Sequence, residues 1–330
     1  MGITCVSMNS SHTPGVAAPV LEALKTLNGI RVALIAPAGG VGDDRIDAAL
    51  SLLGHAGVEA IPGHHIRDHH RYLAGTAAAR LADLHAAFAR PDIDAVWCLR
   101  GGYGSAHLID GIDWDAIPHH VPLIGHSDIT ALASAFAARG KPAIHGPVAV
   151  DLLREWRADE AESFAGSLAS LAPALRGGFN ALTLVHQGGP HPSTDASIWG
   201  GNLTVLASIA DLLLAPPGDG PITLLLEDVG EAAFRLERCF HQIVRAPWFS
   251  RVNAVVLGAF YRCTLPDGMQ SFLDVVRDHI DTDRVGLFDQ APIGHGRFNQ
   301  AWSMGAPVRI SDTPSHDPRS STLSQVHEPD

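Results

Sequence analysis

The first half of the chain alternates short, very apolar runs with segments of helical periodicity, and this alternation restricts the possible folds more than any other feature. Apolar runs at Arg31–Ala36, Ala95–Leu99 and Val121–Ile124 are each followed by a glycine-containing loop. Between them, Arg45–Ala56 and Ala77–Ala89 carry apolar residues at helical spacing. Buried strands that alternate with helices are typical of a parallel sheet covered on both faces. The sequence therefore predicts an α/β fold.

The pattern weakens between Asp159 and His191, so we place a domain junction there. Beyond it, apolar runs at Ile222–Leu226 and Ala254–Phe260 indicate buried strands around a helix at Ala232–Val244. After residue 310 the chain is polar and rich in proline, which is typical of a disordered tail. The expected division is a loose N-terminal extension over residues 1–28, a first domain over 29–165, a linker over 166–192, a second domain over 193–311 and a polar tail over 312–330.

The charge and hydropathy of the chain limit its partners. The chain has 23 Lys and Arg against 35 Asp and Glu, a net charge of −12, and no basic run, which argues against a nucleic-acid partner. No run approaches the roughly 18 apolar residues of a membrane span. The first residues also lack the basic and apolar stretches of a secretory signal. We therefore expect a cytoplasmic protein without membrane contact.

Histidine is abundant, with 19 residues, but its spacing does not favour a metal site. The pairs His64–His65, His69–His70 and His119–His120 are adjacent, whereas ligands on one helix face need a separation of three or four residues. His65 and His69 have that separation but lie in a loop-like segment, and they are the remaining zinc candidate. The four cysteines form no CxxC pair. We expect no metal and no other cofactor.

The segment Leu123–Thr130, with the sequence LIGHSDIT, carries the strongest chemical signal. A buried strand ends at Gly125, and Ser127 follows at a sharp turn into a helix. This geometry would push the Ser127 hydroxyl clear of the sheet and aim free helical N–H groups at the group it attacks. The alternative is that Ser127 only caps the helix. The segment also departs from the G-x-S-x-G pattern, because Ile129 replaces the second glycine.

A glycine-rich segment, Arg100–Gly104, with the sequence RGGYG, directly follows another buried strand. Glycines such as Gly101 and Gly102 let a backbone approach a ligand closely and can orient N–H groups as an anion pocket beside Ser127. An ordinary strand-to-helix turn is the alternative interpretation. A phosphate loop is disfavoured because no G-K-[ST] follows.

Two further residues would complete a hydrolytic site. Glu227 directly follows the apolar run Ile222–Leu226, and α/β folds place ligands at the carboxyl ends of such strands. His295 lies between two glycines, so its imidazole is free to reach into a cleft as a general base. A solvated strand end and a surface histidine are the alternatives. With Ser127, the set supplies nucleophile, acid and base in an order that the serine-hydrolase triad tolerates.

With these residues identified, the chain resembles the LD-carboxypeptidases, or muramoyltetrapeptide carboxypeptidases, of serine peptidase family S66. The resemblance extends from about Arg31 to Ile310, and eight motifs occur in the family's order. They are APA at Ala36–Ala38, YLAG at Tyr72–Gly75, RGGYGS at Arg100–Ser105, GHSDITAL at Gly125–Leu132, HGP at His145–Pro147, GGNL at Gly200–Leu203, LLEDVGE at Leu225–Glu231 and PIGHG at Pro292–Gly296.

The resemblance implies an N-terminal Rossmann-like domain, a C-terminal α/β domain, an active site in the cleft between them and commonly a homodimer. It assigns the nucleophile to Ser127, the acid to Glu227, the base to His295 and the oxyanion N–H groups to Gly102 and Asp128. In the same glycine-rich loop, Gly101 and Tyr103 are further substrate-binding candidates, and Arg100 is a candidate for binding the substrate's terminal carboxylate.

The implied activity is hydrolysis of the L,D-bond that releases the terminal D-Ala of a murein tetrapeptide, in peptidoglycan recycling. One alternative is a family S66 hydrolase of another peptidyl conjugate, as in the microcin-immunity branch. The other is a ligand-binding relative without catalysis. His126 stands where the family more often has an aromatic residue and could alter substrate contacts.

Overall fold

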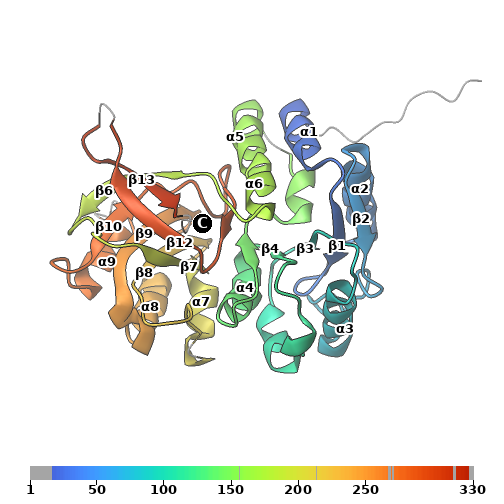
Figure 1. The fold of residues 1–330 in the computed structure, drawn as a ribbon, viewed down its shortest axis with the longest axis horizontal. Helices are drawn as coiled ribbons and strands as arrows, with labels where there is room; N and C mark the ends of the chain where they lie inside the picture. Colours follow the sequence, from blue (N-terminus) through green and yellow to red (C-terminus); the bar gives the residue numbers. More distant parts are fainter. Residues whose placement is uncertain are drawn as a thin grey trace, which may run out of the picture.

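The apolar runs of the first half form a six-stranded sheet in the order β11-β5-β4-β3-β1-β2 (Figure 1). In this computed structural model, residues 17–155, 157–212, 214–266, 269, 271–314 and 317–326 are described. The pairs among β1 to β5 are all parallel, as predicted, and the short β11 is antiparallel to β5. The strands are β1 (Arg31–Ile35), β2 (Glu59–Pro62), β3 (Ala95–Cys98), β4 (Leu123–Gly125), β5 (Ala143–His145) and β11 (Trp302–Ser303).

Helices connect these strands where the periodicity predicts them. The helices predicted at Arg45–Ala56 and Ala77–Ala89 are confirmed, with slightly different ends, and the turn at Ser127 leads into a helix as predicted. The helices of this half are α1 (Ala18–Leu24), α2 (Asp43–His55), α3 (Ala77–Phe88), α4 (Thr130–Ala137), α5 (Ala158–Ala169) and α6 (Leu171–Leu175), with 3₁₀ turns at Lys25–Leu27, Ser105–Gly111, Trp114–Ala116, Ser127–Ile129 and Ala149–Leu153.

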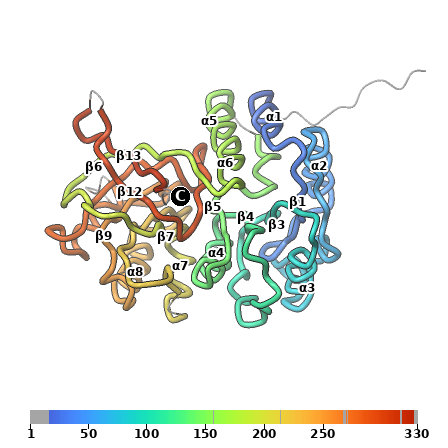
Figure 2. Tube along the Cα trace, viewed as in Figure 1, coloured from blue at the N-terminus to red at the C-terminus, as the bar shows by residue number. Residues whose placement is uncertain are grey.

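The second half forms a closed barrel in the order β10-β6-β13-β12-β7-β8-β9. Neighbours from β7 through β10 pair in parallel, and the other pairs are antiparallel. Figure 2 shows β6 (yellow-green) beside β13 (red), although they are far apart in the sequence. The elements are β6 (Leu182–Gly188), β7 (Ala196–Asn202), α7 (Leu203–Ser208), β8 (Ile222–Val229), α8 (Ala233–Val244), β9 (Val252–Tyr261), α9 (Leu273–His279), β10 (Gly286–Asp289), β12 (Pro307–Asp312) and β13 (Ser320–Gln325), with 3₁₀ turns at Ala210–Leu212 and Pro247–Arg251.

Helix α4 lies where the two halves meet. All eight of its residues are buried, and it contacts β4 and β5 of the sheet as well as β7 and α7 of the barrel side. Its sequence, TALASAFA, is rich in alanine and serine, so neighbouring elements can approach it closely on both sides. The segment that precedes this helix therefore opens at the boundary between the two halves.

Two expectations about the ends of the chain are wrong for the residues that the structure describes. Within the expected loose extension over residues 1–28, α1 buries Val20 and Leu24 and packs against α5; residues 1–16 lie outside the described part. Within the expected polar tail over 312–330, β13 pairs with β12 and β6 and buries Leu323; residues 315, 316 and 327–330 lie outside the described part. Backbone pairing and packing outweigh the polar composition there.

The segment over 166–192, expected as a linker, contains the last residues of α5 and all of α6 and β6. The division into domains stays a prediction. Across the described ranges, no helix combines the length and the apolar character that crossing a membrane requires.

Candidate active site

Ser127 lies at the end of β4, in a turn whose backbone is strained. Strand β4 ends at Gly125, His126 is extended, and Ser127 has φ +63°, in the left-handed region. Non-glycine residues rarely adopt this region, at a cost of order 1–3 kcal/mol, and such strain often occurs at functional positions. An ideal Cβ at Gly125 would lie 2.9 Å from Ile129 Cγ2. Because Gly125 has no Cβ, there is room for Ile129, which stands where the G-x-S-x-G pattern has its second glycine.

The glycine-rich loop after β3 packs directly against this turn. An ideal Cβ at Gly101 would lie 2.8 Å from Ser127 Cβ and 3.2 Å from its Oγ, so only glycine fits there without displacement. Gly102 has φ +109°, which also favours glycine. The loop is fixed from behind, because Gly39 N donates to Gly101 O at 3.0 Å and Arg100 Nη1 donates to Gly40 O at 3.0 Å.

Asp128 connects the loop to the serine turn. Its buried carboxylate accepts from Ser105 N at 2.8 Å, and the Ser105 hydroxyl donates to Asp128 O at 2.5 Å. Burial raises the pKa of this carboxyl, and hydrogen bonds from Ser105 and the nearby Arg80 oppose that rise. Arg80 is itself buried and donates to Pro37 O at 2.6 Å and Gly104 O at 2.8 Å. These contacts fix the glycine-rich loop and the segment at Pro37 relative to the turn that carries Ser127.

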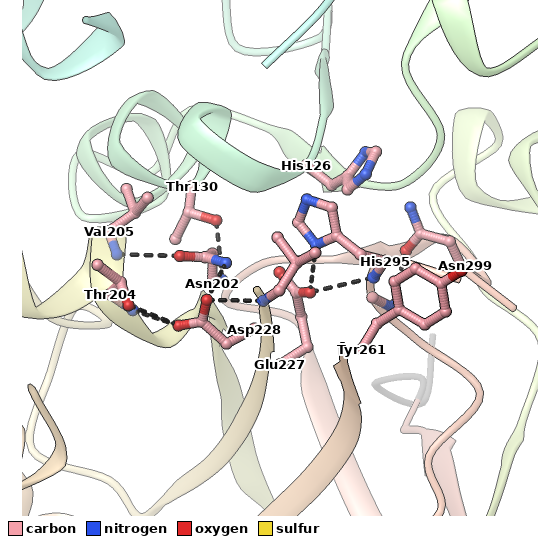
Figure 3. Close-up of polar contacts among 12 residues, drawn as sticks. His126, Thr130, Asn202, Thr204, Val205, Glu227, Asp228, Tyr261, His295 and Asn299 are labelled. Atoms are coloured by element: carbon pink, nitrogen blue, oxygen red, sulfur yellow. Dashed lines mark hydrogen bonds and ion pairs between the residues drawn. The ribbon is translucent and has the colours of Figure 1, made fainter. Parts of the chain in front are cut away.

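Glu227 and His295 form a buried ion pair at the end of β8. The imidazole Nδ1 lies 2.7 Å from Glu227 Oε2, and the same oxygen accepts from the His295 backbone N–H at 3.1 Å (Figure 3). The Glu227 side chain is fully buried and that of His295 is 19% exposed. An ideal Cβ at Gly294 would lie 2.7 Å from Glu227 Cβ, so the glycine before His295 permits this close approach.

The pKa values of the pair shift in the directions expected for an ion pair. Burial alone would raise the pKa of Glu227, but the charge of His295 and the hydrogen bond from its ring outweigh burial and hold the pKa at about 2. Burial lowers the pKa of His295, and the Glu227 carboxylate raises it to a net value above the usual 6.5. The carboxylate is therefore ionised across the physiological range and favours the imidazolium form of His295.

A hydrogen-bond chain joins the serine turn to the strand that carries Glu227 (Figure 3). Asn202 N, at the end of β7, donates to Thr130 Oγ1 at 3.0 Å, three residues after Ser127. The Asn202 amide then donates to Asp228 Oδ1 at 3.3 Å, next to Glu227. The nucleophile candidate and the acid candidate, about a hundred residues apart, are thus fixed relative to each other.

His126 lies against His295, with ring centroids 4.9 Å apart (Figure 3). It is 5% exposed, its Nδ1 lies 3.8 Å from Asp151 Oδ2, and its ring centroid is 6.0 Å from that of His145. Burial lowers the pKa of His126, partly opposed by Asp151. A neutral ring thus packs beside the His295 imidazole.

The structure brings most of the predicted residues together, with two qualifications. Ser127 and His295 share no hydrogen bond in the described part of the chain, and catalytic hydrogen bonds are often long before substrate binds. Tyr103 is 53% exposed and its ring meets Tyr72 at 5.7 Å, so it lies on the rim of the loop rather than in its interior.

Several residues of the site could not be found from sequence patterns. Arg80, Thr130 and Asn202 act through tertiary hydrogen bonds. Thr130 and Asn202 fall within the noted motifs GHSDITAL and GGNL, but the patterns did not indicate these contacts, and Arg80 lies in none of the motifs. His145 is fully buried and stacks on Trp302 at 5.1 Å.

A cavity of about 790 Å³ opens beside His295. Polar and charged side chains on its wall include Arg154, Arg157, Asp159, Tyr261, Gln290 and Arg297. A smaller recess of about 40 Å³ adjoins it and is lined by His126, Asp151, Arg154, Phe164, Gly294, His295, Gly296 and Asn299. His295 and Arg154 border both spaces, so they mark where the recess meets the cavity.

The zinc candidate from the sequence does not gain a ligand set in the structure. His65 Nδ1 lies 2.9 Å from Asp68 Oδ2, and His69 packs against Gly40. Within the described ranges, no group of three or more His, Cys, Asp or Glu side chains is placed to hold a metal ion.

Matches to known proteins show which family the chain belongs to. Sequence profiles of the LD-carboxypeptidase N-terminal and C-terminal domains match residues 32–146 and 195–310. A murein tetrapeptide carboxypeptidase of Pseudomonas aeruginosa is 42% identical over 279 residues, which cover 83% of this chain and 91% of that protein. The chain therefore belongs to the LD-carboxypeptidase family, peptidase family S66.

Solved structures have the same fold. The muramoyltetrapeptide carboxypeptidase of Oxalobacter formigenes superposes with a TM-score of 0.77 at 24% identity, over 91% of this chain and all (100%) of that one. A microcin C7 self-immunity protein, MccF, superposes with a TM-score of 0.76 at 18% identity, over 91% of this chain and 97% of that one. At these identities the likeness shows the fold alone.

Proposed function

We propose that this protein is a serine carboxypeptidase that releases the terminal D-Ala of a murein tetrapeptide by hydrolysing its L,D-bond. The observation that carries the proposal is the buried Glu227–His295 pair, 2.7 Å from Nδ1 to Oε2, beside a serine held at φ +63°. The Pseudomonas aeruginosa relative, whose name states this substrate, supports the choice of substrate class.

Ser127 is the proposed nucleophile and His295 its general base. With Nδ1 engaged by Glu227, the free nitrogen of the imidazole is Nε2, which accepts the Ser127 proton as the hydroxyl attacks the scissile carbonyl. The Glu227 carboxylate stabilises the imidazolium that forms. The imidazolium then donates its proton to the leaving D-Ala amine, and a water molecule hydrolyses the acyl-enzyme by the same route.

The backbone N–H groups of Gly102 and Asp128 are the proposed oxyanion donors. Both flank Ser127, one from the glycine-rich loop and one from the serine turn. Within the part of the chain that the structure describes, neither N–H is used by another hydrogen bond. Removing one such donor costs about 3–4 kcal/mol of transition-state stabilisation in comparable hydrolases. The contacts of Asp128 and Ser105 keep the two donors in fixed positions.

Mass spectrometry of a murein tetrapeptide incubated with the protein tests the proposal. We expect tripeptide and free D-Ala from the wild type, and a drop of about 10⁴–10⁶ in kcat for Ser127→Ala with the fold retained. A fluorophosphonate probe should label the wild type and not the variant. Undiminished turnover by Ser127→Ala would overturn the assignment of the nucleophile.

The same assay separates the alternatives. Cleavage of a peptidyl-nucleotide conjugate in place of the tetrapeptide would indicate a microcin-immunity type of hydrolase, and binding without turnover or labelling would indicate a non-catalytic relative. A role in peptidoglycan recycling, a homodimer and a cytoplasmic location remain predictions drawn from the sequence.

A further inference from the structure

An exopeptidase must recognise the free carboxylate at the end of its substrate, and the chemistry restricts where that recognition occurs. In the leaving D-Ala, the carboxyl carbon lies about 2.5 Å from the scissile nitrogen, across two covalent bonds. The group that protonates this nitrogen is within hydrogen-bond reach of it. A cationic side chain that binds the carboxylate must therefore border the same space as His295.

We propose that Arg154 binds the carboxylate of the leaving D-Ala and thereby limits the enzyme to substrates with a free C-terminus. The inference rests on the proposed function and adds a substrate-binding residue to it. Arg154 follows the 3₁₀ turn Ala149–Leu153, on the N-terminal half, and lines both the recess and the larger cavity beside His295.

The contacts around Tyr261 support this position. The guanidinium carbon of Arg154 lies 6.0 Å from the centroid of the Tyr261 ring. An ideal Cβ at Gly296 would lie 3.8 Å from Tyr261 Cδ2, and Figure 3 shows Tyr261 beside His295. Tyr261 is thus near both Arg154 and the loop of His295, in agreement with the presence of Arg154 and His295 in the lining of the same two spaces.

Acidic side chains also line this wall, and each has a contact of its own. Arg297 pairs with Asp159 at 3.6 Å, and Glu160 accepts from Arg157 N at 3.3 Å, so two acids of the wall already have partners. In the recess itself, Asp151 accepts from Val148 N at 3.1 Å. Arg154 therefore brings a positive charge to a wall on which Asp159 is paired with Arg297, and Asp151 and Glu160 accept backbone N–H groups.

Arg100, the candidate named from the sequence, is less suited to this task. Its Nη1 donates to Gly40 O at 3.0 Å. Its Nε would lie 3.6 and 3.7 Å from ideal Cβ atoms at Gly39 and Gly102. Arg100 thus supports the backbone of the glycine-rich loop, on the side of the oxyanion donors rather than beside the leaving group.

The test compares a tetrapeptide that ends in D-Ala with the same peptide ending in D-Ala amide. Binding to both is measured in the Ser127→Ala background, and kcat/KM for the acid is measured with Ser127 intact. We expect the acid to bind about 10- to 100-fold more tightly than the amide, as charge-assisted hydrogen bonds predict. Arg154→Ala should bring that ratio near one and lower kcat/KM for the acid by a similar factor, with the amide unaffected.

Two further variants make the result specific. Arg154→Lys keeps the charge but loses the two-pronged geometry, so the ratio should fall part of the way. Arg157→Ala, on the same cavity wall but outside the recess, should keep the wild-type ratio. Amide binding equal to wild type shows that each variant is folded, and Arg154→Gln replaces the alanine variant if that one is not.

An unchanged acid-to-amide ratio in Arg154→Ala overturns the inference. A fall of the ratio to near one in the single variant Arg157→Ala or Arg100→Ala also overturns it. These outcomes leave the proposed function intact when the wild type still releases D-Ala. A wild type that neither binds nor cleaves the tetrapeptide would instead refute the proposed function, and the role of Arg154 would fall with it.

Discussion

Replacing Glu227 with glutamine tests the buried ion pair with almost no change in shape. Glu227 Oε2 accepts from both the backbone N–H and the ring Nδ1 of His295. The backbone N–H can only donate, so it selects the amide oxygen of the glutamine at that position. His295 therefore keeps its tautomer, with the proton on Nδ1, and the variant removes only the negative charge.

The size of the effect follows from the distance between the charges. Unit charges about 4 Å apart interact by about 4 kcal/mol at an effective dielectric constant of about 20. The imidazolium that forms during attack loses this stabilisation, so kcat should fall by about 10³. A second cost is structural: Glu227 Oε1 is buried without a hydrogen-bond partner among the described residues, and an amide NH₂ there stays unsatisfied at about 1–3 kcal/mol of folding stability.

The assay is the pH dependence of kcat/KM for D-Ala release, with thermal unfolding measured in parallel. Because Glu227 raises the pKa of His295 and the neutral imidazole is the base, the wild-type rate should rise through a pKa above 6.5. Glu227→Gln should move this limb to lower pH as well as lowering the plateau. Glu231→Gln is the matched control, the same chemical change four residues along, where the carboxylate contacts Arg235 at 3.4 Å.

A double-mutant cycle with His295→Ala completes the test. If Glu227 acts through the imidazole, Glu227→Gln should add almost nothing to the loss in His295→Ala. Additive losses, or a Glu227→Gln enzyme with the wild-type pH limb, would refute this reasoning and leave Glu227 as a structural carboxylate.

Three further predictions concern the same residues. Gly101→Ala should lower kcat by about 10²-fold or more in the D-Ala assay while far-ultraviolet circular dichroism stays unchanged, because its Cβ would lie 2.8 Å from Ser127 Cβ. The pKa of Glu227, about 2 when folded against an ordinary 4.5, corresponds to about 3 kcal/mol of stability that is present above pH 4.5 and lost as pH falls toward 2; denaturant unfolding should show a smaller loss over this window in Glu227→Gln. From the histidine spacing, full activity should survive exhaustive chelation, and loss of activity that zinc restores would reverse this prediction.

Sequence patterns predicted the strands that are buried on both faces of a sheet. β1, β3, β8 and the core of β9 are buried on both faces and therefore read as continuous apolar runs. β13 reads SSTLSQ, with Leu323 as its one large apolar residue, and its position depends on pairing with β12 and β6. A local pattern cannot reveal pairing of that kind.

The candidate site divides in the same way. Ser127, Glu227 and His295 lie in short motifs with a strand end or flanking glycines, so their neighbours in sequence already mark them as candidates for a site. Arg80 and Arg154 have no such context. Their contacts with Gly104 and Tyr261 arise only after distant segments pack together.

The N-terminal sheet can be completed only late in synthesis, because its edge strand β11 lies far along the chain from the other strands. Trp302 and Ser303 pair with His145 and Ile144, so the edge of the sheet beside β5 is completed by residues made long after the rest of it. At about 5–20 residues per second, a ribosome would reach β11 roughly 10–30 s after β5. During that interval β5 has an open edge, which other strands can pair with. A chaperone that shields this edge during translation would therefore protect the nascent chain from aggregation.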